Sequence, residues 1–167
     1  LYAEEDMISY SACGLPYFIE GLIEDPQRLI VRRPEQFEEL GANIHLNKRC
    51  IKIMPDEKKI RIEDIKTGEI EEVEYDKLAI TTGARPVLPA IRNIHLPNIF
   101  TVRKLQDGIN IRNKMRDPET KKAVIVGAGY IGIEMLEAFY LNGIETHMLE
   151  MNEHILSIFD PEISDMI

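Results

Sequence analysis

The stretch Ala123-Val-Ile-Val-Gly127-Ala-Gly129-Tyr-Ile-Gly132-Ile-Glu134 decides the fold of this 167-residue chain. An apolar run of strand type enters a turn with three glycines, and an amphipathic helical segment follows. The later segment His147-Met-Leu-Glu150 predicts a second strand that ends in a carboxylate. A strand, a G-x-G-x-x-G turn, a helix and an acid about 20 residues on are typical of a βαβ unit that binds a dinucleotide.

Each position in this pattern has a physical reason. Gly127 permits the sharp turn from strand to helix, and Gly129, which has no Cβ, lets a pyrophosphate approach the amides at the helix start. Gly132 lets the helix pack close to the strand. Glu150 follows Gly132 by 18 residues and is expected to accept hydrogen bonds from an adenosine ribose. Its charge repels a 2′-phosphate, so the sequence favours NADH over NADPH.

Composition excludes several kinds of partner. The chain is 44% hydrophobic and 29% charged, as in ordinary globular proteins, and its net charge is −9. This charge argues against nucleic acid or an anionic membrane as a partner, and no apolar run has the length of a membrane span. The two cysteines give no disulfide framework, which fits a cytoplasmic protein. We predict no metal site.

The rest of the chain predicts further helices and strands. They are a helix over 34–40, a strand over 43–54, a hairpin of strands 59–63 and 69–75, a short buried strand 78–82, a brief strand 99–102 and a helix over 103–115. Asp117-Pro118 ends the last helix, so we expect a domain boundary there. The first residues resemble the end of a strand, and the chain stops soon after Glu150. We therefore expect a piece of a longer protein, truncated at both ends.

The segment Ser9-Tyr-Ser-Ala-Cys13-Gly-Leu-Pro-Tyr17 places a cysteine at a turn or a helix N-terminus. There the helix dipole favours thiolate over thiol, and a thiolate beside a redox cofactor can act as a nucleophile and two-electron carrier. From spacing alone, an inert cysteine in a turn is the commoner interpretation. Because no CxxC motif is present, a redox role would use one protein sulfur and an external partner. Cys50 lies in a strand pattern and is interpreted as a small core or sheet residue.

These pieces together resemble the single-cysteine branch of the flavin-dependent pyridine nucleotide-disulfide oxidoreductases, which includes coenzyme A-disulfide reductases, NADH oxidases and NADH peroxidases. The resemblance covers essentially the whole chain and is carried by the segments 9–17, 75–86, 99–103 and 127–134. It implies an α/β, Rossmann-like two-domain flavoprotein that binds FAD and NADH, with NADPH less favoured, and forms a homodimer. Residues 1–118 would be part of the FAD-binding domain, with the redox cysteine and the hairpin, and residues 119–167 the start of the NAD-binding domain.

The resemblance also implies roles for individual residues. Electrons would pass from NADH on the glycine turn, through FAD, to Cys13, with Ser9 near the substrate thiol. Tyr130 resembles the family tyrosine that screens the flavin, and Glu134 the acid near the flavin–nicotinamide contact. The remaining residues that the resemblance assigns to cofactor binding are Ile131, at the helix start, and Thr82 and Gly83, in the strand-turn of the FAD domain.

Three functions stay open at this point. The first is reduction of a small disulfide such as coenzyme A disulfide, favoured by the Leu-Pro-Tyr17 that follows Cys13. The second is reduction of oxygen or peroxide through a sulfenic acid on Cys13. The third is a non-catalytic nucleotide-binding fragment, if these residues are isolated. Two departures weigh here: Ala12 stands where coenzyme A-disulfide reductases often have Asn, and Ala3 where the family often has an acid for the FAD ribose.

Overall fold

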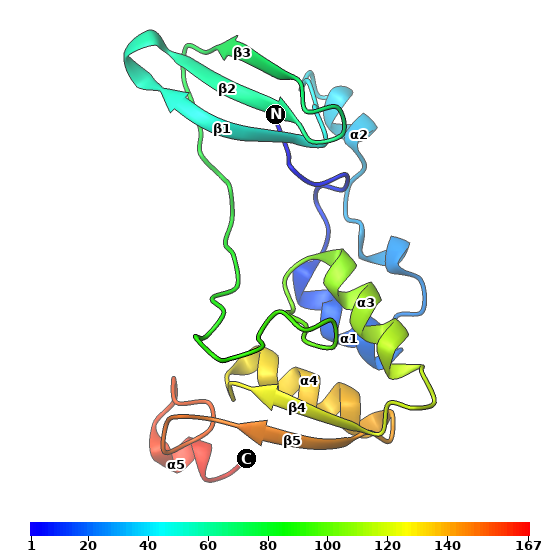
Figure 1. Ribbon diagram of the computed structural model, residues 1–167. Helices are drawn as coiled ribbons and strands as arrows, with labels where there is room; N and C mark the ends of the chain where they lie inside the picture. Colours follow the sequence, from blue (N-terminus) through cyan, green and yellow to red (C-terminus); the bar gives the residue numbers. More distant parts are fainter. The chain divides into compact units, whose positions relative to one another are not determined.

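The computed structural model describes residues 1–167 and divides into two compact units, each of mixed α/β structure (Figure 1). Unit 1 comprises Leu1–Tyr10 and Ile30–Ala84, and unit 2 comprises Ser11–Leu29 and Arg85–Ile167. This division by contacts does not follow the predicted domain boundary at residue 118, which stays a prediction. Neither unit contains a helix with the length and apolar character needed to cross a bilayer.

Unit 1 is built on a three-stranded antiparallel sheet, in the order β1-β2-β3. The strands are β1 (Lys48–Met54), β2 (Lys59–Asp64) and β3 (Ile70–Glu74), and the short helix α2 (Pro34–Glu38) precedes them. The expected hairpin and the expected helix are therefore confirmed. A 3-10 turn, Pro55–Glu57, joins β1 to β2.

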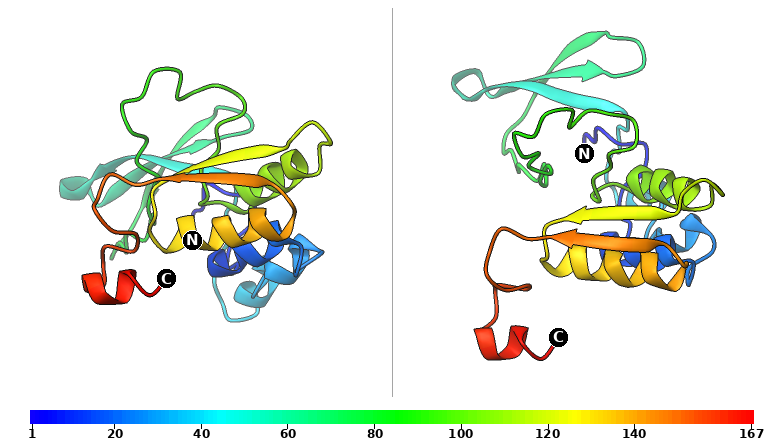
Figure 2. Two further views of the ribbon diagram at one scale, coloured as in Figure 1. Left: turned by 90° about the horizontal axis from the view of Figure 1, so that it is seen from below. Right: turned by 60° about the horizontal axis from the view of Figure 1, so that its bottom comes forward.

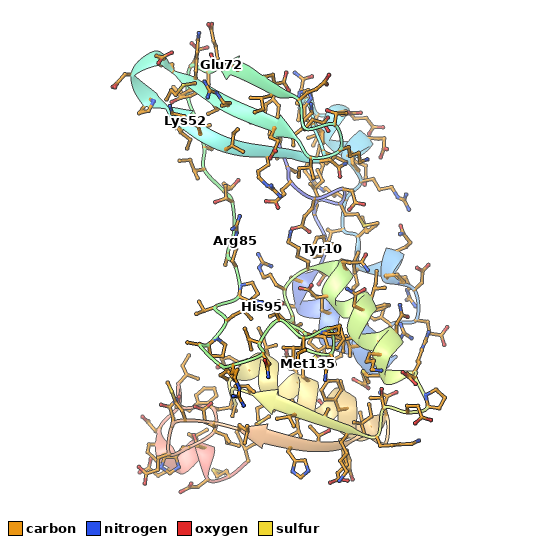
Figure 3. The ribbon with its side chains drawn as sticks, viewed as in Figure 1. Tyr10, Lys52, Glu72, Arg85, His95 and Met135 are labelled. Carbon is orange, nitrogen blue, oxygen red and sulfur yellow. The ribbon has the colours of Figure 1, made fainter.

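The register of the sheet places opposite charges across from one another. Arg61 on β2 faces Glu72 on β3 and donates a hydrogen bond from Nη2 to Oε1 at 2.8 Å; Figure 3 labels Glu72. This hydrogen bond lowers the pKa of Glu72 below its ordinary value. At the other face of β2, Ile60 and Ile62 are buried. The alternation of buried and charged side chains fixes the register, because a slip of one residue would bury the charges.

The turn between β2 and β3 is closed by one side chain. Asp64 Oδ1 accepts hydrogen bonds from the N–H groups of Lys66 at 2.8 Å and Thr67 at 3.0 Å, and Gly68 takes φ +75°. Short polar side chains that bond the backbone two or three residues on are typical of tight turns. The same N–H groups, together with Lys48, lower the pKa of Asp64.

Strand β1 begins five residues later than the sequence pattern predicts. Asn47 has φ +57°, a left-handed conformation that interrupts an extended chain. The residues before it form only an isolated bridge, in which His45 pairs with Tyr2 and their rings stack at 4.6 Å. Cys50 lies in β1, as expected of a sheet residue, but at an irregularity of the register and exposed, so it is not part of the core.

Unit 2 contains the βαβ unit predicted from the glycine pattern. Strands β4 (Lys122–Val126) and β5 (Glu145–Leu149) pair in parallel, and α4 (Tyr130–Leu141) connects them. Figure 2 shows α4 along one side of the strand pair. Helices α1 (Leu15–Glu20) and α3 (Leu105–Met115) add to this unit, and the short α5 (Pro161–Ser164) follows β5. The expected helix over 103–115 is thus confirmed.

The core of unit 2 forms where α1 packs against both α3 and α4. It consists of small and aliphatic side chains and one aromatic ring that are 6% exposed or less: Leu15, Phe18, Ile19, Leu105, Ile111, Met135 (Figure 3) and Ala138. Gly108 on α3 lies so close to α1 that an added Cβ would be 3.1 Å from Leu15 Cδ2. The first segment of the unit is therefore held by residues that come about a hundred positions later in the chain.

A buried arginine joins α3 to the chain that follows α1. Arg112 is 6% exposed, and its Nη1 donates to the carbonyl oxygens of Ile23 at 2.9 Å and Glu24 at 2.8 Å. Its guanidinium also lies 4.5 Å from the centroid of the Phe18 ring. Burial lowers the pKa of Arg112. The positive charge of Arg112 is still stabilised, because the carbonyl oxygens and the ring replace the water that burial removes.

Two of the strands predicted from the sequence are absent from the structure. Residues 78–82 and 99–102 have no strand structure. Ile80 is 64% exposed and Ile99 is 40% exposed, so neither segment is buried. A strand needs a neighbour to satisfy its backbone N–H and C=O groups, and no segment of these 167 residues pairs with them.

Replacing Arg112 with alanine should destabilise unit 2 by about 2 kcal/mol, because two partly buried carbonyl oxygens lose a charged donor and a buried side chain is removed. The free energy of unfolding in denaturant measures this loss. Arg116→Ala, on an exposed side chain near the end of the same helix, is the matched control and should change it little. Equal stability of the two variants would contradict the role given to Arg112.

Candidate functional site

The glycine turn starts where β4 ends beside β5. Gly127 has φ +106°, a conformation open to glycine and strained for other residues. Its N–H donates to the carbonyl oxygen of Leu149 at 2.8 Å, which continues the pairing of the parallel strands by one residue. The sharp turn predicted for Gly127 is therefore present.

The other two glycines meet different surroundings. A Cβ built on Gly129 has no atom within 4 Å, so the backbone there borders open space. A Cβ on Gly132 would overlap the carbonyl oxygen of Gly127 and lie 3.5 Å from Ile125 Cγ2. Gly132 thus lets the first turn of α4 approach the end of β4, as predicted. Gly129 leaves room where a ligand could approach the backbone.

The start of α4 also presents unused hydrogen-bond donors. No side chain caps the helix at Gly129, and the backbone N–H groups of Gly129, Tyr130 and Ile131 have no acceptor in the chain. Free N–H groups and the positive end of the helix dipole favour an anion at this place. Open space and free donors together fit the pyrophosphate of a dinucleotide.

Glu150, the acid predicted to hold a ribose, is bound to the same turn. Its Oε2 accepts from Ala128 N at 2.7 Å, and its Oε1 accepts from the N–H groups of Met151 and Asn152, both at 2.8 Å. These bonds, that from Ala128 first, lower the pKa of Glu150, so the group is ionised at neutral pH. A carboxylate has about four acceptor positions. Backbone N–H groups use three of these positions, and the Asn152 side chain also acts on the carboxylate, so the contact of Glu150 with a ribose stays a prediction.

The chain after Glu150 returns to the turn, a feature that the sequence analysis missed. Leu156 N donates to the carbonyl oxygen of Ala128 at 2.8 Å, and its side chain is 6% exposed. Phe159 meets Tyr130 edge to face, with ring centroids 5.8 Å apart and planes at 88°. No spacing rule marks Leu156, because its hydrogen bond uses the backbone. The sequence gives no signal for the role of Phe159 either.

Cys13 lies in the same unit as the turn. It is exposed, in a 3-10 turn (Ala12–Gly14) that leads directly into α1, so the predicted position at a helix start is confirmed. A Cβ on Gly14 would lie 2.5 Å from Leu29 Cδ2, so a side chain beside the cysteine would require the buried Leu29 side chain to shift. Helix α1 packs on α4, and Asn142 Nδ2 donates to the carbonyl oxygen of Glu20 at 2.8 Å. The helix after the thiol and the helix after the glycine turn are thus fixed to each other.

The remaining predicted residues are exposed. Tyr130 and Ile131 are each 54% exposed at the start of α4, and Glu134 follows on the same helix. Ser9, Thr82 and Gly83 belong to unit 1. Ser9 has φ +56° and Gly83 has φ +69°. The structure therefore brings together the three glycines, Tyr130, Ile131 and Glu150. Ala3 stands where the family often has an acid for the FAD ribose. The carboxylate of the neighbouring Glu4 pairs with Arg49 at 3.1 Å.

A parallel strand pair, a glycine turn with free amides and an acid at the end of the second strand define an α/β protein with a dinucleotide-binding site. The sequence matches the family described as pyridine nucleotide-disulphide oxidoreductase over residues 1–167. The chain belongs to this family.

Known relatives cover the same segment. An NADH oxidase of Enterococcus faecalis is 32% identical over 168 residues, and an NAD(P)H coenzyme A polysulfide/persulfide reductase of Pyrococcus horikoshii is 34% identical over 169 residues. Each match covers 100% of this chain and 37% of the relative. The water-forming NADH oxidase of Lactobacillus brevis, solved with NADH, is 30% identical with a TM-score of 0.94, and the match covers 99% of this chain and 36% of that one. The chain thus spans a little over a third of these proteins.

Two glycine variants should distinguish the space left for a ligand at Gly129 from the close packing of α4 on β4 at Gly132. Gly129→Ala should leave stability within about 0.5 kcal/mol of the starting protein, because its Cβ enters open space, but weaken NADH binding about tenfold or more. Gly132→Ala should destabilise the fold by about 1–3 kcal/mol, because its Cβ overlaps a backbone oxygen. Thermal unfolding and NADH titration measure both effects. If Gly129→Ala bound NADH normally, the turn would not be the pyrophosphate site.

Proposed function

We propose that this chain carries the nucleotide turn and the redox thiol of an FAD-dependent oxidoreductase, which passes electrons from NADH to Cys13 and on to a small disulfide such as coenzyme A disulfide. The packing of α1 on α4 supports this proposal most, because it fixes an exposed thiol in the same compact unit as the glycine turn. The protein is a homodimer in the cytoplasm in this proposal; its two cysteines are both free thiols.

The residues of the turn would hold NADH. The amides of Gly129, Tyr130 and Ile131 bind the pyrophosphate, and the Glu150 carboxylate binds a ribose hydroxyl. Thr82 and Gly83, both exposed, contact the flavin. FAD, when bound, supplies the two-electron carrier between the nicotinamide and the thiol. Tyr130 and Glu134 lie at the nicotinamide end of this path.

The Cys13 thiolate would react with the disulfide in two balanced steps. It attacks one sulfur of the substrate, so a protein–substrate disulfide forms and the first thiol leaves with a proton. Two electrons from NADH then break that bond, which regenerates the thiolate and releases the second thiol. In total, NADH and one proton reduce one disulfide to two thiols. Ser9 is assigned to hold the substrate thiol.

A second candidate uses the same thiol on oxygen or peroxide. The relative from Enterococcus faecalis is named an NADH oxidase, and its identity to this chain is close to that of the persulfide reductase. In this reaction the thiolate attacks one oxygen of hydrogen peroxide and becomes a sulfenic acid; the O–O bond breaks, and the other oxygen leaves as hydroxide, which takes up a proton to give water. Two electrons and two protons then return it to the thiol and release water.

Cys13→Ser should reduce NADH-dependent cleavage of coenzyme A disulfide to background, because a hydroxyl cannot form the mixed disulfide. NADH affinity should stay the same, since Cys13 does not contact the nucleotide turn. Cys50→Ser, on β1 of unit 1, is the matched control and should keep full activity. Disulfide reduction that survives Cys13→Ser would rule out the first candidate, and NADH consumption with oxygen alone would favour the second.

Glu150→Gln should lower the preference for NADH over NADPH about tenfold. A carboxylate a few ångströms from a 2′-phosphate costs on the order of 1 kcal/mol for each pair of like charges in water, and the amide removes this repulsion. Dissociation constants for NADH and NADPH, measured on both proteins at neutral pH, give the ratio. An unchanged ratio would show that Glu150 does not meet the adenosine ribose.

A further inference from the structure

The glycine turn is held from outside by the chain that follows Glu150. We propose that residues 151–159, here called the strap, position the turn for the dinucleotide, and that Leu156 and Phe159 are its positioning residues. This inference rests on the proposed binding of NADH at the turn. It assigns a role to a segment that contributes no glycine, acid or thiol to the site.

Glu150 and the strap together hold the backbone of Ala128 at both of its polar groups. Glu150 Oε2 accepts from the Ala128 N–H at 2.7 Å, and the Ala128 carbonyl oxygen accepts from Leu156 N at 2.8 Å. Ala128 lies between the first two glycines of the turn and is 1% exposed. With both groups engaged, the peptide planes on either side of Ala128 cannot rotate freely. The free amide of Gly129 belongs to one of these planes, so its direction is fixed.

Leu156, in the strap, has a strained backbone. Its φ is +46°, a left-handed conformation that costs a leucine free energy. Such a conformation persists when the surroundings determine it. Here the side chain of Leu156 is buried, and its N–H faces the turn. The strained residue is therefore the one that contacts the site.

A contact between two aromatic rings also joins the strap to the turn. Phe159 N donates to the Leu156 carbonyl oxygen at 2.9 Å, so the two positioning residues lie in one tight turn. The Phe159 ring meets Tyr130 edge to face, which is a favoured geometry for aromatic pairs. Tyr130 carries one of the free amides of α4. The strap thus contacts the turn before and after Gly129 and leaves Gly129 itself open.

The strap is also closed on itself. Asn152 Nδ2 donates to Ser157 Oγ at 3.1 Å, and the N–H groups of Met151 and Asn152 bind Glu150 Oε1. A loop with internal hydrogen bonds and two contacts to the site can hold the amides in their binding positions before the ligand arrives. Such preorganisation strengthens binding because less freedom is lost when the ligand binds.

Binding of ADP-ribose, which has the pyrophosphate but no nicotinamide, tests this role in the protein expressed from its complete gene. Leu156→Ala should raise the dissociation constants for ADP-ribose and NADH about tenfold and equally. Phe159→Ala should raise them about threefold, and Phe159→Tyr should restore them. The rate at saturating NADH should stay the same, so KM changes and kcat does not. Hydrogen exchange of the peptide that covers 127–132 should be faster in both alanine variants.

Tyr140→Ala removes an aromatic ring that is 76% exposed at the far end of α4, and it is the matched control. It should change neither dissociation constant. Unchanged constants in both Leu156→Ala and Phe159→Ala would overturn the role of the strap while the proposed function stands. If Leu156→Ala fails to unfold cooperatively, Phe159→Ala decides, since its ring is 41% exposed. A starting protein that does not bind ADP-ribose would overturn the proposed function and the strap together.

Discussion

The structure of unit 2 depends on one close approach, between Gly132 on α4 and the carbonyl oxygen of Gly127. A side chain of any size at position 132 would overlap that oxygen and push the helix away from the strand. The approach brings the helix start to the end of β4, where its unused amides face open space. The parallel pairing of β4 with β5, which Gly127 N continues to Leu149 O, sets where β5 ends, so Glu150 can reach Ala128. The free donors at the start of α4 therefore lie beside the acid that follows β5.

Much of this arrangement could be predicted from the sequence, because its signals are local. Three glycines at fixed spacing, an apolar run before them and an acid at the end of the next run predict the βαβ unit. The hairpin of unit 1 is equally local: alternating side chains lead into a turn that Asp64 and Gly68 close. The position of Cys13 at a helix start could be predicted from its neighbours Gly14 and Pro16.

The errors have a shared cause, since they concern contacts between distant parts of the chain. Residues 78–82 and 99–102 have strand composition but no partner strand among these residues, and composition alone does not provide one. The contacts of Leu156 use a backbone N–H, which every residue except proline has. Nothing in the sequence therefore distinguishes Leu156 from its neighbours. The same holds for Arg112, whose partners are two backbone carbonyls almost ninety positions away.

Helix α1 has a consequence for synthesis of the protein. Its end is tied to Asn142, 122 residues later in the chain, and its side chains pack on α3 and α4. A ribosome adds about 5–20 residues each second, so several seconds pass between the emergence of the thiol and that of the helices which support it. During this interval the cysteine belongs to an unpacked segment. The chain thus completes the surroundings of Cys13 only when the glycine turn is itself complete, so under the proposed function the segment that carries the thiol is packed and the nucleotide site is formed at the same stage of synthesis.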